Sequence, residues 1–278
     1  MKQVKALVPT GYGLNCDYET LFCLRRAGAE ADPIHINDII AAAGTGEGQT
    51  LSKYDILVLG GGFSWADDHG AGVLMASKLK HHLGDDIDRF IQDGKLIVGI
   101  CNGFQVLVNL GLLPGFDGNY TARRIALIGN DSGNFIDTWV KLKVEQESCC
   151  VYMNGISEIE LPVRHGEGKF YASDDVLDLL EANKQVVLRY ADQEGNPAGG
   201  RRPANPNGSI HDIAGICDPT GRIFGLMPHP EAFNHFTNHP CWTRIKESDK
   251  RRGITDRAEE GDGIAIFRNA VRYVMNTK

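Results

Sequence analysis

The 278-residue sequence lacks long hydrophobic runs and long runs of basic residues. No stretch approaches the roughly 18 consecutive apolar residues that a membrane span needs. The apolar part of the N-terminus, MKQVKALVPTGYG, is also too short for a signal peptide. A net charge of −7 without a Lys/Arg cluster argues against binding to nucleic acid or to an anionic membrane. We therefore expect a soluble globular protein whose ligands are small molecules or other proteins.

The seven cysteines lack both of the regular patterns that cysteines commonly form. Their spacings are irregular, with one adjacent pair, Cys149 and Cys150, and no C-x-x-C motif. Neither a disulfide framework nor a thiolate zinc site is indicated. The sequence therefore predicts free thiols in the reducing environment of the cytoplasm.

Nucleotide-binding motifs are missing as well. No G-x-x-x-x-G-K-[ST] phosphate loop occurs, and GYGLNC at residues 11–16 lacks the third glycine of the dinucleotide fingerprint. We expect no cofactor in this chain.

Short apolar runs that alternate with helical stretches indicate the fold class. Residues 5–9, 55–62 and 95–100 are typical of buried strands, and each run contains or is followed by Gly or Pro. Helices are predicted over residues 15–28, with Asn15 as N-cap and Gly28 as the stop signal, and over 73–83 and 104–113. This alternation predicts an α/β fold with a mostly parallel sheet and helices on both faces.

The second half of the chain has a different pattern. Residues 138–144 and 185–190 alternate between apolar and polar, which predicts antiparallel strands at one edge of a mixed sheet. A last helix over 263–276 should bury one face, formed by Ile264, Phe267, Val271 and Val274. Since no repeat or linker stands out, we expect one domain spanning 1–278.

Residues 99–105, GICNGFQ, place a cysteine between two glycines where a buried strand ends. This G-x-nucleophile-x-G form is typical of a sharp strand-to-helix turn. The start of a helix favours a thiolate at Cys101, and the backbone N–H of Asn102 would face a developing oxyanion. The alternative is that small residues merely let the helix pack on the sheet, with Cys101 as a core thiol.

A thiol nucleophile needs a base, and His229 is the best candidate. It follows the apolar run of RIFGLMPHPE, and Glu231 lies two residues later, where its carboxylate can orient the imidazole. Pro228 and Pro230 would stiffen the segment. Cys101, His229 and Glu231 thus supply a nucleophile, a base and an orienting acid.

A metal cluster of His229, His235 and His239 with Glu231 is a competing interpretation. His235 and His239 have the i, i+4 spacing of ligands on a helix. However, HFTNHPCW is rich in helix breakers and no H-E-x-x-H motif occurs. We therefore predict no metal site.

Six motifs together resemble one family. GICNGFQ with MPHPE is similar to the class I (triad) glutamine amidotransferases. Four further stretches resemble the glutaminase subunits of phosphoribosylformylglycinamidine synthases: NCDYET (15–20), GGFSWADD (61–68), LPVRHGEGKF (161–170) and PNGSIHDIAGI (206–216). The similarity runs from about residue 4 to 233 and is looser afterwards, so the chain has a C-terminal extension from about 234.

The resemblance implies a flavodoxin-like core, and a Cys101 nucleophile that releases ammonia from glutamine. It also implies further groups that stabilise the oxyanion or hold glutamine: Gly61, Gly62, Asn102, Gln105 and His165. For His165 a turn-stabilising hydrogen bond is an equal alternative. The PNGS segment is interpreted as an ordered turn near the site or a docking surface.

The resemblance also implies a partner. Ammonia would pass to a synthetase subunit that uses ATP and magnesium to convert formylglycinamide ribonucleotide to the amidine, and the assembly allows for a small bridging subunit. Two other functions compete: a free-standing cysteine hydrolase of the α/β-hydrolase type, and a non-catalytic regulatory subunit. In the hydrolase fold the acid precedes the histidine, whereas Glu231 follows His229.

The sequence departs from the family pattern at three places. Gly60 stands where proline is usual, Trp65 where we expect tyrosine, and Asp137-Thr138 where Cys-Arg is common. The first change would loosen the predicted oxyanion loop, and the last removes an arginine contact.

Overall fold

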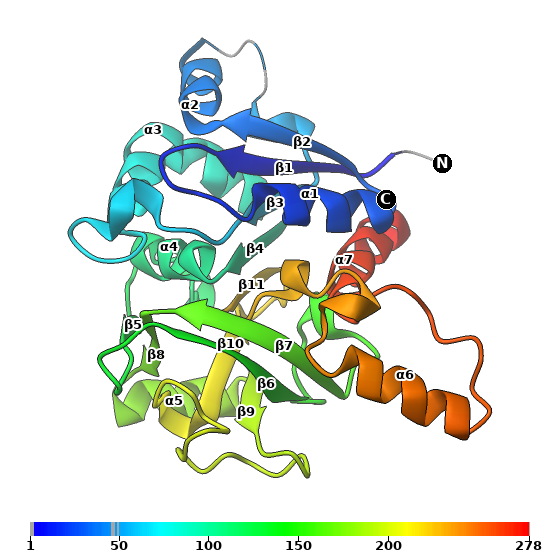
Figure 1. The fold of residues 1–278 in the computed structure, drawn as a ribbon. Helices are drawn as coiled ribbons and strands as arrows, with labels where there is room; N and C mark the ends of the chain where they lie inside the picture. Colours follow the sequence, from blue (N-terminus) through cyan, green and yellow to red (C-terminus); the bar gives the residue numbers. More distant parts are fainter. Residues whose placement is uncertain (1–2, 46–47, 49, 278) are drawn as a thin grey trace.

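The computed structural model describes residues 3–45, 48 and 50–277. A nine-stranded sheet, in the order β2-β1-β3-β4-β11-β10-β9-β6-β7, forms the centre of the molecule, and β5 pairs with β8 in a separate ribbon (Figure 1). The strands are β1 (Lys5–Thr10), β2 (Glu30–His35), β3 (Ile56–Leu59), β4 (Leu96–Ile100), β5 (Ala126–Gly129), β6 (Ile136–Val144), β7 (Glu158–His165), β8 (Glu167–Tyr171), β9 (Val186–Ala191), β10 (Ile213–Cys217) and β11 (Ile223–Leu226). The helices are α1 (Asp17–Arg26), α2 (Ile36–Thr45), α3 (Val73–Gln92), α4 (Asn102–Leu110), α5 (Asp174–Ala182), α6 (Trp242–Arg251) and α7 (Ile264–Thr277).

The sheet has a parallel half and an antiparallel half, as predicted. Strands β2, β1, β3, β4 and β11 are parallel and have the 2-1-3-4-5 order of flavodoxin-like folds. Strands β10, β9, β6 and β7 continue the sheet in antiparallel pairing. Every residue of β3, β4 and β11 is buried, which explains their unbroken apolar sequences.

Two helical layers cover the parallel half. Helix α1 packs against α7, whereas α3 packs against α2 and α4 (Figure 1). All four residues predicted for the buried face of the last helix are buried in the core, namely Ile264, Phe267, Val271 and Val274. The end of the C-terminal extension is therefore part of the central core. Among the described residues, no helix combines the length and apolar character that a membrane crossing requires.

Several predicted boundaries were wrong for local reasons. Helix α1 begins at Asp17 with Cys16, not Asn15, at the N-cap position, and the Asn15 N–H donates to the carbonyl of Gly61. Strand β3 ends at Leu59, since Gly60–Gly62 already form the next loop. Helix α3 continues to Gln92, and α4 ends at Leu110, where Gly111 adopts a φ of 86°.

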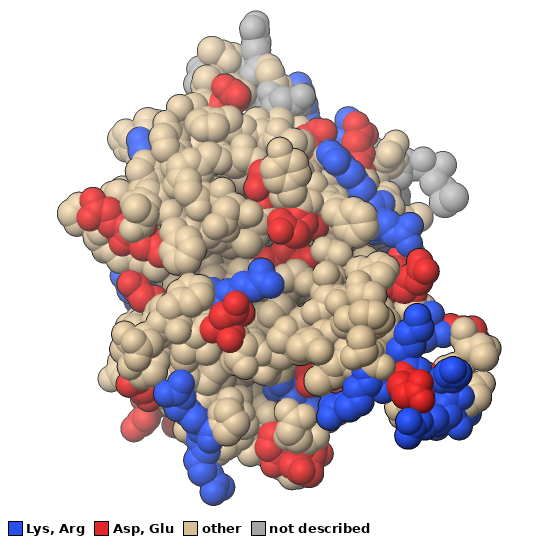
Figure 2. Space-filling model, in the orientation of Figure 1, with Lys and Arg blue, Asp and Glu red and all other residues tan. Residues whose placement is uncertain are grey.

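The remaining part of the extension, residues 234–263, forms a projection beside the end of β6 and the start of β7. Helix α6 projects from the sheet at the lower right of Figure 1. Its exposed cations, which colour this corner blue in Figure 2, are Arg244, Lys246, Lys250 and Arg251.

Candidate active site

Cys101 lies at the sharp turn between β4 and α4. Its backbone has φ 51° and ψ −106°, a strained conformation for a residue with a side chain, and its N–H donates to the Leu226 carbonyl at 2.8 Å. A Cβ on Gly103 would lie 1.9 Å from the carbonyl oxygen of Leu59, and one on Gly99 would lie 2.5 Å from that of Gly103. Both glycines are therefore required for α4 to start this close to the sheet.

The side chain of Asn102 links this turn to the loop after β3. Its Nδ2 donates to Asp67 Oδ1 at 3.0 Å and to Gln105 Oε1 at 3.1 Å, while its Oδ1 accepts the N–H of Ser64 at 3.3 Å. The backbone N–H of Asn102 is the first of α4, so it has no carbonyl partner within the helix. This is the geometry an oxyanion donor requires, and the role itself stays a prediction.

Gly61 and Gly62 lie in a loop held by the segment that precedes α1. The Phe63 N–H donates to the Gly13 carbonyl at 2.9 Å, and Leu14 forms an antiparallel bridge with Gly62. A Cβ on Gly61 would lie 2.8 Å from Cε1 of His229. The predicted oxyanion loop is thus in direct contact with the predicted base.

His229 and Glu231 form a buried pair at the end of β11. The imidazole Nδ1 lies 2.5 Å from Glu231 Oε1, and the two side chains are 3% and 1% exposed. Glu231 is on a short 3₁₀ turn, η6 (Pro230–Ala232), and the His229 N–H donates to the Pro162 carbonyl at 2.8 Å. The first contact holds the ring, and the second holds the backbone that carries it.

The charges around His229 favour its protonated form. Burial by itself lowers the pKa of the imidazole, but the carboxylate of Glu231 and the interaction with Cys101 outweigh burial and raise the pKa well above its usual value. The Nε2 atom of His229 is buried and has no hydrogen-bond partner in the protein. This nitrogen is available to exchange a proton with a reacting group.

Pairing of β4 with β11 brings the nucleophile and the base together. The two strands are parallel neighbours with Ile100 opposite Leu226, so Cys101 and His229 follow the carboxyl ends of adjacent strands. The thiol of Cys101 also donates to the Arg164 carbonyl at 3.6 Å and is 5% exposed. The structure therefore assembles Cys101, His229 and Glu231 at the edge where ligands bind in such sheets.

His165 is buried in a hydrogen-bond network next to this site. Its Nδ1 lies 3.0 Å from Asn130 Oδ1, which also accepts the Gly168 N–H, and burial lowers its pKa to about 4. Its Nε2 lies 3.5 Å from Asn207 Nδ2. The PNGS segment is thus an ordered turn with a buried Asn207. This agrees with the first of its two predicted roles, an ordered turn near the site or a docking surface. These bonds fit the turn-stabilising interpretation of His165.

Gln105 is also engaged within the protein. Its Nε2 donates to the Glu167 carbonyl, and its Oε1 accepts from Asn102. The side chain is 4% exposed. A direct role for Gln105 or His165 in holding glutamine remains a prediction.

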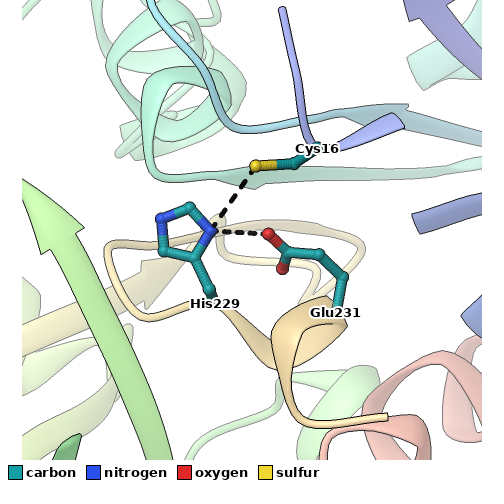
Figure 3. A group of neighbouring side chains, drawn as sticks. All are labelled: Cys16, His229 and Glu231. Carbon is teal, nitrogen blue, oxygen red and sulfur yellow. Dashed lines mark hydrogen bonds and ion pairs between the residues drawn. The ribbon is translucent and has the colours of Figure 1, made fainter. Parts of the chain in front are cut away.

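Cys16 is a further residue of the site, which was not predicted from the sequence. Its Sγ lies 3.9 Å from Nδ1 of His229 and 3.4 Å from Asn15 Oδ1, so a second thiol reaches the site (Figure 3). Burial raises the pKa of this thiol. Its position in the NCDYET motif is the only signal in the sequence that could have identified it.

The competing histidine cluster does not form among residues 3–45, 48 and 50–277. His239 Nε2 pairs with Glu160 Oε2 at 3.1 Å, and His235 caps the 3₁₀ turn η7 (Phe236–Asn238). In this part of the chain the one group of three side chains able to hold a metal is Cys16, His229 and Glu231.

Fold and site together define an α/β domain with a candidate cysteine nucleophile at the carboxyl edge of its parallel strands. The parallel strands have the flavodoxin-like order, and a cysteine on the turn after β4 faces a His–Glu pair on the turn after β11. Residues 3–274 match the CobB/CobQ-like glutamine amidotransferase domain, and the chain belongs to this family.

Two related sequences and one solved structure show which members of this family the chain is similar to. The chain is 47% identical to phosphoribosylformylglycinamidine synthase subunit PurQ of Methanococcus maripaludis over 271 residues, which is 97% of each chain. It is 42% identical to PurQ of Dehalococcoides mccartyi over 98% of each chain. Among solved structures, PurLQS from Thermotoga maritima includes a chain that aligns with a TM-score of 0.69 and 29% identity, covering 98% of this chain and 100% of that one.

Proposed function

We propose that this chain is the glutaminase subunit of a phosphoribosylformylglycinamidine synthase. It hydrolyses glutamine to glutamate and ammonia, and the ammonia is used to convert formylglycinamide ribonucleotide to the amidine in purine biosynthesis. The PurQ names of relatives that match nearly the whole chain support the pathway. The observation that carries the activity is the buried His229–Glu231 pair on the strand next to Cys101.

The reaction begins with the thiolate of Cys101, which attacks the side-chain carbonyl carbon of glutamine. The resulting oxyanion accepts hydrogen bonds from backbone N–H groups of Asn102 and the Gly61–Gly62 loop. Protonated His229 gives the Nε2 proton to the departing nitrogen, so that ammonia leaves and a thioester remains.

His229 is now neutral and acts as the base for the second half of the reaction. Its Nε2 removes a proton from water, which attacks the thioester carbonyl; glutamate leaves and the thiolate returns. Glu231 keeps the other ring proton on Nδ1 throughout, which holds the ring in the required tautomer.

The ammonia acceptor is bound by partner subunits. The Thermotoga maritima structure, whose title joins PurL, PurQ and PurS, supports a synthetase partner and a small bridging subunit. ATP and magnesium belong to the synthetase, and this chain carries no cofactor of its own. Seven free cysteines are consistent with work in the reducing cytoplasm.

Replacing Cys101 by alanine tests this division of labour. The complex reconstituted with Cys101→Ala should lose glutamine-dependent synthesis of formylglycinamidine ribonucleotide, since a triad without its nucleophile keeps only a small part of its rate enhancement. Synthesis from ammonium salt should continue near the normal rate. Loss of both reactions in an assembled complex would refute the proposal. If the chain were a free-standing hydrolase, it would support neither glutamine-dependent nor ammonia-dependent synthesis.

A further inference from the structure

The three side chains in Figure 3 converge on one small volume on the Nδ1 side of the His229 ring. Cys16 comes from the start of α1, His229 from the end of β11 and Glu231 from the turn η6. One ligand atom from each lies within 4.8 Å of the other two. The only role that the reaction gives this volume is to hold the proton between Nδ1 and the carboxylate.

A second observation points to a missing ligand. The Oε2 atom of Glu231 is buried, in a side chain that is 1% exposed, and it has no hydrogen-bond partner in the protein. A buried carboxylate oxygen without a partner is costly, and a cation is one of the groups that can satisfy it.

The donor set is suited to a zinc ion. Thiolate, imidazole and carboxylate are its usual ligands, at about 2.3 Å, 2.0–2.1 Å and 2.0–2.2 Å, which places tetrahedral ligand atoms roughly 3.5 Å apart. The Cys16 Sγ–His229 Nδ1 distance is 3.9 Å, already close to this value. The Glu231 oxygen, at 2.5 Å from Nδ1, must withdraw by about 1 Å when a metal replaces the proton between them.

We propose that Cys16, His229 and Glu231 form an inhibitory site for zinc, in which the ion takes the place of the proton on Nδ1. The inhibition rests on the proposed glutaminase function, whereas the binding does not. Water completes the four ligands of the ion.

The inhibition follows from the proton balance. On binding, the thiol of Cys16 loses its proton and the imidazolium loses the Nδ1 proton, so two protons are released for each ion bound. The imidazole then carries its one remaining proton on Nε2. Because loss of this proton would leave an imidazolate, the metal-bound ring cannot protonate the departing nitrogen as the imidazolium does, and ammonia is not released.

Cobalt binding tests the site without any measurement of activity. Co²⁺ added to the full-length chain should give the near-ultraviolet absorption of a thiolate–cobalt bond. The band should disappear in Cys16→Ala and in Cys16→Ser, which retains the size of the side chain. It should persist in Cys101→Ala and in the control Cys149→Ala, which removes an exposed thiol.

The reverse pattern, with a band lost in Cys101→Ala and kept in both Cys16 variants, would place the metal on the nucleophile and overturn the proposal. Absence of the band from the wild-type chain would overturn it as well.

Zinc inhibition tests the consequence. In the reconstituted complex Zn²⁺ should stop glutamine-dependent synthesis while the ammonia-dependent reaction continues. Loss of one of three ligands should raise the zinc concentration for half-inhibition at least about tenfold in Cys16→Ser, relative to the metal-free rate of that variant. Equal zinc sensitivity of Cys16→Ser and Cys149→Ala would refute the regulatory role. If the chain bound Co²⁺ through Cys16 but released no glutamate, the proposed function would fail and the metal site would stand.

Discussion

The α-carbon of Gly61 faces the ring of His229 so closely that an added methyl group would lie 2.8 Å from Cε1 and 3.1 Å from the sulfur of Cys16. Such contacts force the ring or the loop to move. Since a misplacement of about 1 Å at a reacting group can cost on the order of 10² in rate, Gly61→Ala should lower glutaminase kcat by about that factor. Gly60→Ala is the matched control, because nothing lies within 4 Å of its added methyl. Equal rates in the two variants would contradict this account of the loop.

Removing the charge of Glu231 should change the pH dependence of the reaction. This carboxylate raises the pKa of His229, so Glu231→Gln lowers that pKa and the imidazolium is lost at a lower pH. The alkaline limb of the kcat/KM profile should therefore move to lower pH, with a loss of up to about 10⁴ in rate.

Glu160→Gln provides the control, since Glu160 pairs with His239 at 3.1 Å outside the site. An unchanged alkaline limb in Glu231→Gln, or an equal displacement in Glu160→Gln, would show that this carboxylate does not tune the base.

Thiol reactivity should follow the site and not exposure. Cys149 is an exposed residue, but its pKa is raised. The main cause is a hydrogen bond with Cys217, and partial burial of the sulfur is the second. A glutamine-like electrophile used below stoichiometry should therefore label Cys101 first, although Cys101 is buried. Peptide mass mapping identifies the labelled residue. Label found first on Cys149 or Cys16 would contradict the assignment of the nucleophile.

Acid should destabilise the protein through His165. Burial lowers its folded-state pKa to about 4, against 6.5 for the free side chain. As pH falls below about 6.5, the unfolded chain binds a proton that the folded chain refuses until about pH 4, so stability is lost across this window and is level below it. The loss is at most roughly 3 kcal/mol.

Urea unfolding at several pH values measures this loss. His165→Gln, which does not titrate, should show a smaller fall in stability between pH 6.5 and 4, whereas His82→Gln, at an exposed position, should behave as wild type. If the free energy of unfolding fell equally with pH in all three proteins, His165 would be ruled out as the group responsible.

Sequence patterns predicted the elements whose burial is uniform or strictly periodic. Strands β3 and β4 are buried on both faces and are apolar throughout. Helix α7 is buried on one face, and its apolar residues lie on that face. The His229–Glu231 contact could also be predicted from the sequence, because both residues lie on one short turn.

Contacts between distant segments could not be predicted in this way. Cys16 reaches His229 across 213 positions, because the loop after β1 crosses the loop after β3. The bonds of Asn102 to Ser64 and Asp67 likewise depend on the packing of α4 and not on any local pattern. The end of α3 was missed because Gly84 interrupts its sequence, although Ile87, Phe90 and Ile91 continue its buried face.

The position of β11 in the sheet has a consequence for biosynthesis. Of the eleven strands in the described part of the chain, this one is the last to leave the ribosome, yet it lies at the centre of the sheet between β4 and β10. Until residues 223–226 emerge, the nascent chain has two open strand edges, which are the surfaces through which incomplete β-proteins aggregate. A chain interrupted before this point would have Cys101 but neither of its partners, so no truncated product could release ammonia without a synthetase to use it.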